Sequence, residues 1–221
     1  MKVVALLPMK GNSERVPNKN LKTFNGRPLY HVIANTLLSS KLISEIYINT
    51  DSEKIKKDIE THFKSIKVLM RPDELVGDFV SMNKIIEHDL NLTDGDLYIQ
   101  THSTNPLLKV DTIDSAIERL VESEGDSYDS VFSVTKVQTR FYEQSGKPHN
   151  HNPEELLRTQ DLEPLYEENS NFFIFTKESF QNRKARIGSK PLMFEMDKVE
   201  AIDIDEPQDF IIAEAIERTL A

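Results

Sequence analysis

Apolar residues occur along the chain in short runs that alternate with helical stripes. The first run, from Lys2 to Pro8, is almost entirely apolar, as is typical of a parallel strand buried on both faces. Further strands are predicted at Ile46–Asn49, Ile66–Met70, Leu97–Gln100, Asp129–Val137, Phe172–Thr176 and Ala201–Ile204. The chain therefore carries enough strands for one sizeable sheet.

Between these strands, apolar residues recur every three or four positions, as on one face of an amphipathic helix. The first helix follows a turn at Asn25–Gly26, with Pro28 in its first turn. The predicted apolar stripes are Leu29, Ile33 and Leu37; Ile55, Ile59 and Phe63; Met82, Ile86 and Leu90; Val110, Ile113, Ile117 and Val121; and Ile212, Ile216 and Leu220. This alternation predicts an α/β fold with a doubly wound, mostly parallel sheet, which binds ligands near the carboxyl ends of its strands.

The alternation stops between Gln138 and Glu168, where Gly146 and several prolines interrupt every candidate element. We interpret residues 138–168 as an excursion outside the main sheet. A length of 221 residues with 38% hydrophobic content suits one core, so residues 1–221 are expected to form a single domain.

Charge and composition exclude several classes of partner. The chain has 37 acidic and 27 basic residues and a net charge of −10, which disfavours binding to nucleic acid or to an anionic membrane. It has no cysteine, no leader pattern, and no apolar segment near the ~18 residues of a membrane span. We expect a soluble, cytoplasmic protein.

The loop after the first strand is a local exception to this acidity, because it contains Lys10, Arg15 and Lys19. Its single glycine, Gly11, matches neither the dinucleotide fingerprint nor the P-loop pattern. Backbone donors and cations in such a loop can surround a triphosphate. The alternative is a solvated loop whose cations pair with Glu14 and nearby acids. The position of the loop at a strand end favours phosphate.

Two carboxylates near the C-terminus are candidate metal ligands. Asp203 and Asp205 alternate with isoleucines, so on an extended backbone both project to one face. Two carboxylates beside a triphosphate suit Mg²⁺. Alternatively, Asp205 caps the final helix in a capping-box arrangement with Gln208, which leaves Asp203 unexplained.

Other polar residues carry weaker signals. Asp51, after the second strand, is interpreted mainly as a helix cap, although it could orient the first loop. Arg71 and Ser81 could face a base or ribose across the cleft. His149 and His151 lack further ligands at a supporting spacing and are interpreted as part of a solvated loop.

The chain carries, in order, the segments LLPMKGNSERVPNKN, INTD, MRPDEL, STNPLL, DSVFSV, RTQDLEPLYEEN and AIDIDEPQDF. With these segments it resembles the acylneuraminate cytidylyltransferases, also called CMP-sialic acid synthetases, over nearly its whole length. The resemblance implies a nucleotide-diphospho-sugar transferase-like fold and a homodimer built through the excursion. It also implies transfer of CMP from CTP to the anomeric hydroxyl of a nonulosonic, sialic-acid-like 2-keto acid sugar, with release of pyrophosphate and dependence on Mg²⁺.

The resemblance also assigns residue roles. The implied CTP-binding residues are Pro8, Met9, Lys10, Gly11, Asn12, Ser13, Arg15, Lys19, Asn20, Arg71 and Ser81. Catalytic roles are implied for Lys10, Arg15, Lys19, Asp203 and Asp205, with both aspartates holding Mg²⁺. The implied sugar-binding residues are His102, Thr104, Asn105, Arg158, Asn169 and Phe173, with Arg158 acting in the neighbouring subunit's site.

Several positions depart from the family pattern. Lys10 stands where the family commonly has arginine, and Arg15 gives the loop a likeness to the 3-deoxy-manno-octulosonate cytidylyltransferases. His102 replaces a usual glutamine, and Phe173 replaces a tyrosine, which hints at a less hydroxylated acceptor. An eight-carbon keto acid or a phosphonate is the alternative acceptor, and a catalytically silent nucleotide-binding protein is the alternative of another class.

Overall fold

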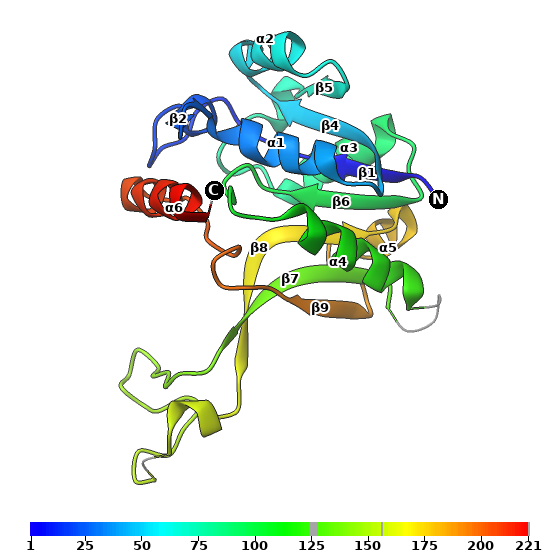
Figure 1. Cartoon of the computed structure of the whole chain (residues 1–221). Helices are drawn as coiled ribbons and strands as arrows, with labels where there is room; N and C mark the ends of the chain where they lie inside the picture. Colours follow the sequence, from blue (N-terminus) through cyan, green and yellow to red (C-terminus); the bar gives the residue numbers. More distant parts are fainter. Residues whose placement is uncertain (124–127, 156, 221) are drawn as a thin grey trace.

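In the computed structural model, which describes residues 1–123, 128–155 and 157–220, one seven-stranded sheet lies between two layers of helices (Figure 1). The expected single domain, residues 1–221, and the expected excursion, residues 138–168, each include positions that lie outside the described residues. The strand order is β5 (Ile66–Met70), β4 (Ile43–Thr50), β1 (Val3–Leu6), β6 (Leu97–Thr101), β8 (Leu165–Phe175), β7 (Ser130–Val137) and β9 (Pro191–Glu195). Only β8 runs antiparallel to its neighbours. The predicted doubly wound, mostly parallel sheet is confirmed.

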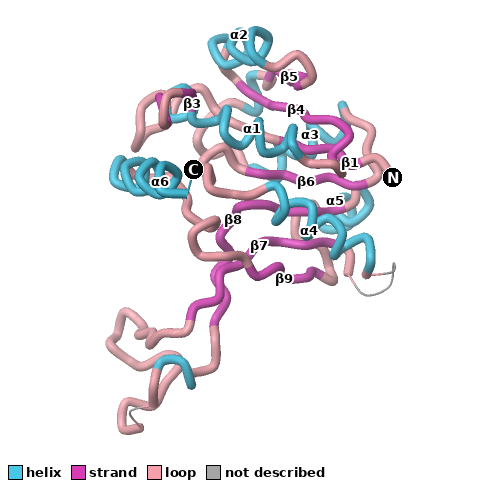
Figure 2. The backbone as a smooth tube through the Cα atoms, viewed as in Figure 1, coloured by secondary structure: helices cyan, strands magenta, loops and turns pink. Residues whose placement is uncertain are grey.

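Helices cover both faces of the sheet (Figure 2). α1 (Leu29–Ser39), α2 (Glu53–His62) and α4 (Val110–Glu122) pack against one face through a single apolar cluster. α3 (Met82–Leu92) and α5 (Lys177–Arg183) pack against the other. The predicted stripe Leu29, Ile33 and Leu37 is fully buried, because Ile33 and Leu37 pack on the sheet and Leu29 packs with Phe24 and Phe210.

The last helix, α6 (Pro207–Leu220), packs away from the main sheet, on the hairpin of β2 (Thr23–Phe24) and β3 (Arg27–Pro28). Its buried residues are Phe210 and Ala213, and the Phe210 ring meets Phe24 edge-on. The expected stripe of Ile212, Ile216 and Leu220 is therefore wrong, since Ile212 and Leu220 are more than half exposed. The hairpin contacts a different side of the helix from the one that periodicity selected.

Other expectations also fail at the C-terminal end. Residues 201–204 form a turn and an irregular segment where a strand was expected. α5 and β9 were not predicted, because each is short and is flanked by polar residues in the sequence. Strand β8 begins at Leu165, so the last four residues of the expected excursion belong to a strand that pairs with β7.

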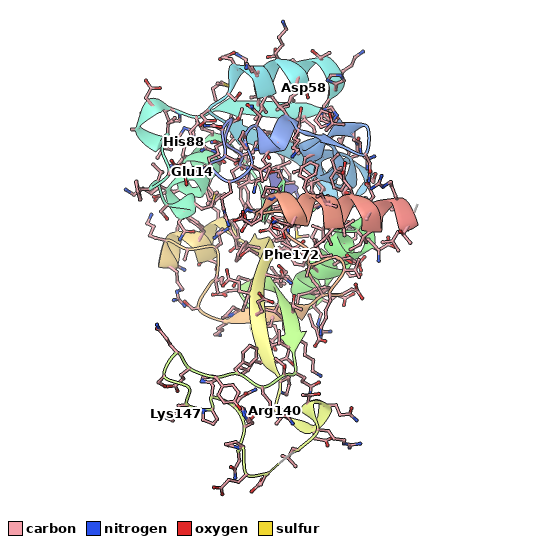
Figure 3. All side chains as sticks on the ribbon, turned by 90° about the vertical axis from the view of Figure 1, so that its left-hand side faces the viewer. Glu14, Asp58, His88, Arg140, Lys147 and Phe172 are labelled. Carbon is pink, nitrogen blue, oxygen red and sulfur yellow. The ribbon has the colours of Figure 1, made fainter. Side chains whose placement is uncertain are left out.

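The rest of the excursion, residues 138–164, is called the arm here. It leaves the sheet at the end of β7 and returns at the start of β8, and it contains the short helix η3 (Thr159–Asp161). Figure 3 shows Arg140 and Lys147 in the arm, well away from the layers that contain Phe172. The arm thus projects from the body as a separate lobe on a two-stranded ribbon.

The topology places a crevice at the carboxyl end of β1. The chain passes from β1 to β4 on one side, and β6 later pairs with β1 on the other. The connections on the two sides of β1 leave in opposite directions, which opens a crevice at their carboxyl ends. The loop after β1, residues 7–18, therefore lies at the place where open α/β sheets bind ligands.

Candidate active site

A cleft of about 380 Å³ opens at the carboxyl ends of β1 and β6. The first loop, the loops after β5 and β6, the start of α3, and the segment before α6 all contribute to its walls. The lining residues are Pro8, Met9, Lys10, Ser13, Glu14, Arg15, Lys19, Asn20, Arg71, Gly77, Asp78, Val80, Met82, Ile85, His102, Ser103, Thr104, Asp203 and Asp205. Most of the CTP-binding residues expected from the sequence thus share one cavity.

The first loop is fixed to the end of β4. The Gly11 amide donates to the Asp51 carboxylate at 2.6 Å. A Cβ on Gly11 would lie 2.6 Å from the Cβ of Ser52, so only glycine fits this approach. Ser52, rather than Asp51, caps α2 by accepting from the Ile55 amide. The capping interpretation of Asp51 is therefore wrong, and Asp51 orients the loop. Gly11 itself does not line the cleft.

Asn20 ties the first loop to the loop after β6. Its side chain donates to the Lys10 carbonyl at 2.8 Å and accepts from the Ser103 hydroxyl at 2.6 Å. Asn20 is only 5% exposed, so this bridge is shielded from water. A short buried bridge of this kind holds two walls of the cleft at a fixed separation.

The segment that carries the two aspartates is fixed to the same place. The Ile204 amide donates to the Thr104 carbonyl at 2.9 Å, and the Lys19 ammonium donates to the Ile204 carbonyl at 2.6 Å. The Ile204 side chain is fully buried. The isoleucine therefore anchors the segment in the core, and the flanking aspartates lie in the cleft.

Asp205 does not cap the final helix, which was its alternative role in the sequence interpretation. The Asp209 carboxylate accepts from the amides of Asp205 and Glu206, at 3.0 and 2.7 Å, and so satisfies the start of α6. The Asp205 carboxylate instead lies 2.9 Å from the Arg15 guanidinium and 3.5 Å from the Lys19 ammonium. The Asp205 carboxylate therefore does not serve as a helix cap and faces the basic loop.

Each cation of the first loop meets an acid across or beside the cleft. Arg15 also pairs with Glu206 at 3.3 Å, and Lys10 pairs with Asp78 at 2.5 Å. The Lys10 ammonium lowers the pKa of Asp78 below its ordinary value. These pairs are mostly solvent-accessible, so each stabilises the fold weakly and an incoming anion can replace its acidic partner.

The two aspartates fit a hard divalent cation. Partial loss of hydration within the cleft raises the pKa of the Asp203 carboxyl group, although the residue as a whole is exposed, and the nearby negative charge of Asp205 raises it further. The two negative charges repel each other, and a cation bound between them would relieve this repulsion. Oxygen ligands are also those that Mg²⁺ takes, together with phosphate oxygens and water. The donor set therefore suits Mg²⁺.

The end of the cleft next to α3 combines one buried cation with apolar side chains. Arg71 is 9% exposed, and its guanidinium donates to the Asn49 side chain at 2.7 Å. Burial lowers the pKa of Arg71, against the opposing effect of Asp51 and Asp89. Met82 and Ile85 of α3 lie in the same wall. Ser81 only caps α3, by accepting from the Asn83 amide, and it does not line the cleft.

The expected sugar-binding residues divide into two groups. His102 and Thr104 line the cleft, whereas Asn169 lines a second pocket that also contains Asp203. Burial lowers the pKa of His102 to about 4, and the charges of Arg186 and Lys19 act in the same direction. His102 is therefore neutral at pH 7, and its Nε2 has no hydrogen-bond partner among the described residues.

Phe173, Asn105 and Arg158 do not reach the cleft. Phe173 is 1% exposed within β8, and the Asn105 amide donates to the Ile202 carbonyl. Phe173 is therefore a core residue. This corrects the sequence interpretation, which expected Phe173 to contact the sugar. Arg158 lies in the arm and pairs with Asp161 at 2.7 and 3.0 Å.

A family model described as Cytidylyltransferase matches residues 4–218. The chain belongs to the cytidylyltransferase family. The match covers every segment that builds the cleft, from the loop after β1 to the start of α6.

Curated members of the family resemble this chain at moderate identity. An N-acylneuraminate cytidylyltransferase from Streptococcus agalactiae is 28% identical over 217 residues, covering 96% of this chain and 52% of that protein. A pseudaminic acid cytidylyltransferase from Campylobacter jejuni is 22% identical over 227 residues, covering 98% and 96%. The chain thus spans about half the length of the streptococcal relative and almost all of the Campylobacter relative.

Solved structures share the fold at lower identity. A CMP:2-keto-3-deoxy-manno-octonic acid synthetase complexed with CTP aligns with a TM-score of 0.74 at 11% identity, covering both chains completely. A 4-diphosphocytidyl-2C-methyl-D-erythritol synthase from Anaerococcus prevotii aligns with a TM-score of 0.72 at 14% identity, covering 98% of each chain. These likenesses support the nucleotidyltransferase fold of this family member. None of the described helices is long and apolar enough to cross a membrane.

Sequence reasoning missed one partly buried cation close to His102, Arg186. Arg186, between α5 and β9, donates to the Gln100 side chain at 2.5 Å, and its guanidinium lies 3.9 Å from the centre of the Phe173 ring. Burial lowers the pKa of Arg186 to about 10. The residue lies in a stretch without a strong pattern, so only the folded structure could bring it beside His102 and Phe173.

Proposed function

We propose that this protein transfers CMP from CTP to the anomeric hydroxyl of a nonulosonic 2-keto acid sugar and releases pyrophosphate. The observation that carries the proposal is the meeting of Arg15 and Lys19 with Asp205 across a cleft that Asp203 also lines. Relatives named for N-acylneuraminate and pseudaminic acid support this class of acceptor.

CTP binding replaces the internal ion pairs of the cleft. The triphosphate takes the guanidinium of Arg15 and the ammonium groups of Lys10 and Lys19 from their acidic partners. Charge-assisted hydrogen bonds to phosphate are stronger than these exposed pairs, and Arg15 can contact two oxygens at once. The same cations stabilise negative charge on the leaving pyrophosphate during in-line displacement at the α-phosphorus. The cytosine ring then lies toward Arg71, Met82 and Ile85.

Mg²⁺ is the proposed cofactor, and Asp203 and Asp205 would hold it. When bound, Mg²⁺ neutralises phosphate charge and lowers the pKa of a coordinated hydroxyl. The chain's own contribution is to keep the two carboxylates in place through the buried Ile204 and its backbone bond to Thr104. No protein nucleophile is required for this reaction.

The acceptor sugar is proposed to bind in the pocket beside the cleft, because Asp203 lines both cavities. The second pocket contains Asn169, Thr135 and Lys198. A sugar in this position presents its hydroxyl to the α-phosphate next to Asp203. The neutral His102, with an unpartnered ring nitrogen, can exchange a hydrogen bond with the sugar from the cleft side.

A homodimer is proposed to complete the sugar site, with Arg158 of one subunit acting in the other. The arm exposes large apolar side chains, Tyr142 at 57% and Leu157 at 48%, and the ribbon beneath it exposes Tyr166 at 42%. Exposed apolar residues on a projecting lobe are typical of an interface. A partner subunit that packs against the arm would bury these side chains. Arg158 of this chain would then reach the cleft of that partner.

Pyrophosphate release from CTP and N-acylneuraminate, with Mg²⁺ present, tests the proposed reaction. Asp203→Asn should lower turnover by at least a hundredfold, because it removes a charge that acts at the reacting phosphate. Asp94→Asn is the matched control, since Asp94 is exposed and precedes β6 at the opposite end of the strand. Equal activity of the two variants would overturn the assignment of the carboxylate pair.

A panel of acceptors decides the sugar. N-acylneuraminate or another nonulosonic acid is expected to be the best substrate. Preference for 3-deoxy-manno-octulosonate or a phosphonate would keep the nucleotide half of the proposal and replace the acceptor. CTP binding without pyrophosphate release for any acceptor would identify a catalytically silent nucleotide-binding protein.

A further inference from the structure

A cluster of two histidines and one aspartate lies on the helical layer, outside the cleft. His31 comes from α1, whereas Asp58 and His62 come from α2. Their ligand atoms all lie within 4.8 Å of one another, and no other group of three such residues among the described positions is this close. We propose that this cluster binds a divalent transition metal ion, with Zn²⁺ as the best-fitting ion, and that the ion links α1 to α2.

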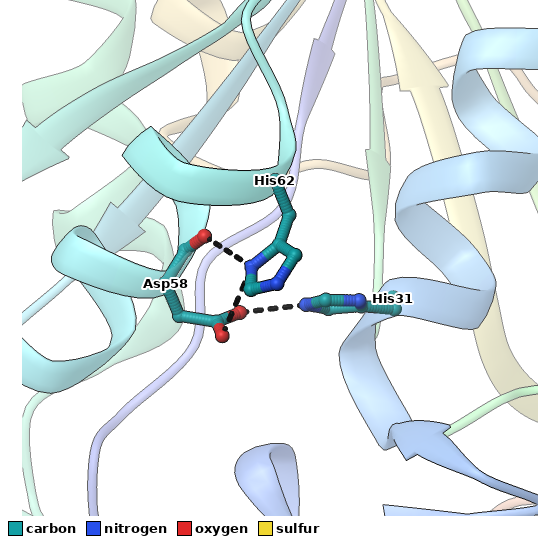
Figure 4. Close-up of side chains that lie close together, drawn as sticks. All are labelled: His31, Asp58 and His62. Carbon is teal, nitrogen blue, oxygen red and sulfur yellow. Dashed lines mark hydrogen bonds and ion pairs between the residues drawn. The ribbon is translucent and has the colours of Figure 1, made fainter.

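The geometry of the three side chains suits this role (Figure 4). His31 Nε2 lies 2.6 Å from Asp58 Oδ2, and His62 Nδ1 lies 3.2 Å from Asp58 Oδ1. Zinc–ligand bonds of about 2.1 Å at the tetrahedral angle separate ligand atoms by roughly 3.4 Å. Because the ligand atoms all lie within 4.8 Å of one another, no separation has to shorten by more than about 1.4 Å for the three side chains to surround one ion. Asp58 and His62 are four residues apart on one helix, which keeps both on the same face.

The surroundings hold the cluster in place before any ion arrives. The His31 ring packs edge-on against Phe63, with ring centres 4.7 Å apart, and lies 5.1 Å from the His62 ring. The Tyr30 hydroxyl donates to Asp58 Oδ2, the oxygen that also faces His31, and this donor helps to orient the carboxylate. A ligating carboxylate that is itself hydrogen-bonded in this way is the usual arrangement around protein-bound metals.

The chemistry of the donors selects the ion. Imidazole nitrogens suit Zn²⁺, Cu²⁺, Ni²⁺ and Fe²⁺, whereas Mg²⁺ and Ca²⁺ prefer oxygen ligands. Three protein ligands leave one tetrahedral position for water. His31 is buried, but the His62 side chain is 52% exposed, so an ion can enter from solvent beside His62. His62 Nδ1 also faces the Asp58 carbonyl at 2.9 Å, and a shift of its proton to Nε2 frees Nδ1 as a ligand.

Zinc binding to the full chain at pH 7.5, measured by competition with a chromophoric chelator, tests this inference. The unaltered protein is expected to bind Zn²⁺ at this site, and His62→Ala should weaken binding there at least tenfold. Asp58→Asn, which preserves side-chain size, should have a similar effect. Because His62 is exposed, its replacement leaves the fold intact, and circular dichroism can verify this.

Two controls separate the cluster from other sites. His151→Ala removes another histidine, in the arm, which contacts Tyr142, and it should leave zinc affinity unchanged. Asp203→Asn removes the proposed magnesium ligand and should also leave this zinc site unchanged, so the inference stands or falls separately from the proposed reaction. Absorption of bound Co²⁺ in the visible range should report a tetrahedral nitrogen and oxygen site that disappears in His62→Ala. Wild-type zinc affinity and stoichiometry in His62→Ala, or no zinc binding by the unaltered chain in the micromolar range, would overturn it.

Discussion

At the scale of single residues, the cleft combines groups whose ionisation is set by their surroundings. Asp203 has a raised pKa because its carboxyl group is partly desolvated in the cleft and lies near Asp205, and His102 has a lowered pKa because its ring is buried near Arg186 and Lys19. Perturbed groups of opposite kind that share one cavity are characteristic of a functional site. The two residues therefore support the proposed position of the reacting end of the cleft more directly than the exposed pairs of Lys10 and Arg15 do.

The pH dependence of stability tests the environment of His102. Its folded-state pKa of about 4 lies below the ordinary value of 6.5, so the folded protein binds this proton less readily than the unfolded chain. The stability that it contributes is present above about pH 6.5 and is lost as pH falls toward 4. His102→Gln should therefore lose less stability than the unaltered protein between pH 7.5 and pH 5, by on the order of 1–2 kcal/mol.

Urea denaturation of both proteins at the two pH values measures this difference. His149→Gln in the arm provides a matched control, because it makes the same chemical change at a different place. If His102→Gln and the unaltered protein lose stability equally on acidification, the ring is not held neutral by burial.

At the scale of elements, periodicity predicted most of the strands of the sheet and most of the helices that pack on it, because burial in the core gives these elements their apolar patterns. Strand β5 was predicted at its observed bounds, Ile66–Met70. Periodicity failed for α6, which packs on the β2–β3 hairpin, and for α5 and β9, which are short. Charge and spacing pointed to the cations of the first loop and to the aspartate pair, and the family resemblance supplied the other predicted cleft residues. The roles of Asp51 and Arg186 depend on contacts between distant segments.

Charged pairs at the edge of the sheet give an element-scale prediction. Glu45 on β4 lies 2.9 Å from Lys67 on β5 and 3.3 Å from Lys2 beside β1. Hydrogen bonds from Lys67 and then Tyr47 lower the pKa of Glu45 from 4.5 to about 2. A lowered carboxyl pKa stabilises the fold above about pH 4.5, and this stability is lost as pH falls toward 2.

Glu45→Gln should therefore melt at a lower temperature than the unaltered protein at pH 7, and the two should converge near pH 2. The effect should be small, because the pairs are accessible to water, and it should shrink in high salt. Thermal melts across this pH range provide the measurement, with Glu53→Gln at the exposed start of α2 as the control. A gap that stays constant down to pH 2 would contradict the assigned interactions.

At the scale of the whole molecule, the arm is the feature that a single subunit does not explain. It projects from the sheet on the β7–β8 ribbon (Figure 1). Its aromatic and aliphatic side chains Tyr142 and Leu157 are exposed. Arg158, which the family resemblance assigns to the sugar, lies in the arm, outside the cleft of its own chain. These facts agree with a site that is shared between two copies.

Subunit mixing tests this arrangement. Asp203→Asn and Arg158→Ala should each be inactive alone. In a mixed dimer, the intact cleft of the Arg158→Ala subunit receives Arg158 from its partner, so random mixing should restore about a quarter of full activity. Pyrophosphate release after co-refolding measures the recovery, and re-mixed Asp203→Asn with itself is the control. Activity no higher than that of either variant alone would place Arg158 outside the neighbouring site.

The central claim is that the basic first loop and the aspartate pair act on one nucleoside triphosphate. A crystal structure with CTP and Mn²⁺ as a substitute for Mg²⁺, recorded with anomalous data, tests it most directly. The account predicts a manganese peak coordinated by Asp203 and Asp205, with Arg15 moved from the Asp205 carboxylate to the phosphates. A triphosphate bound away from the first loop, or a manganese peak that neither aspartate contacts, would contradict it.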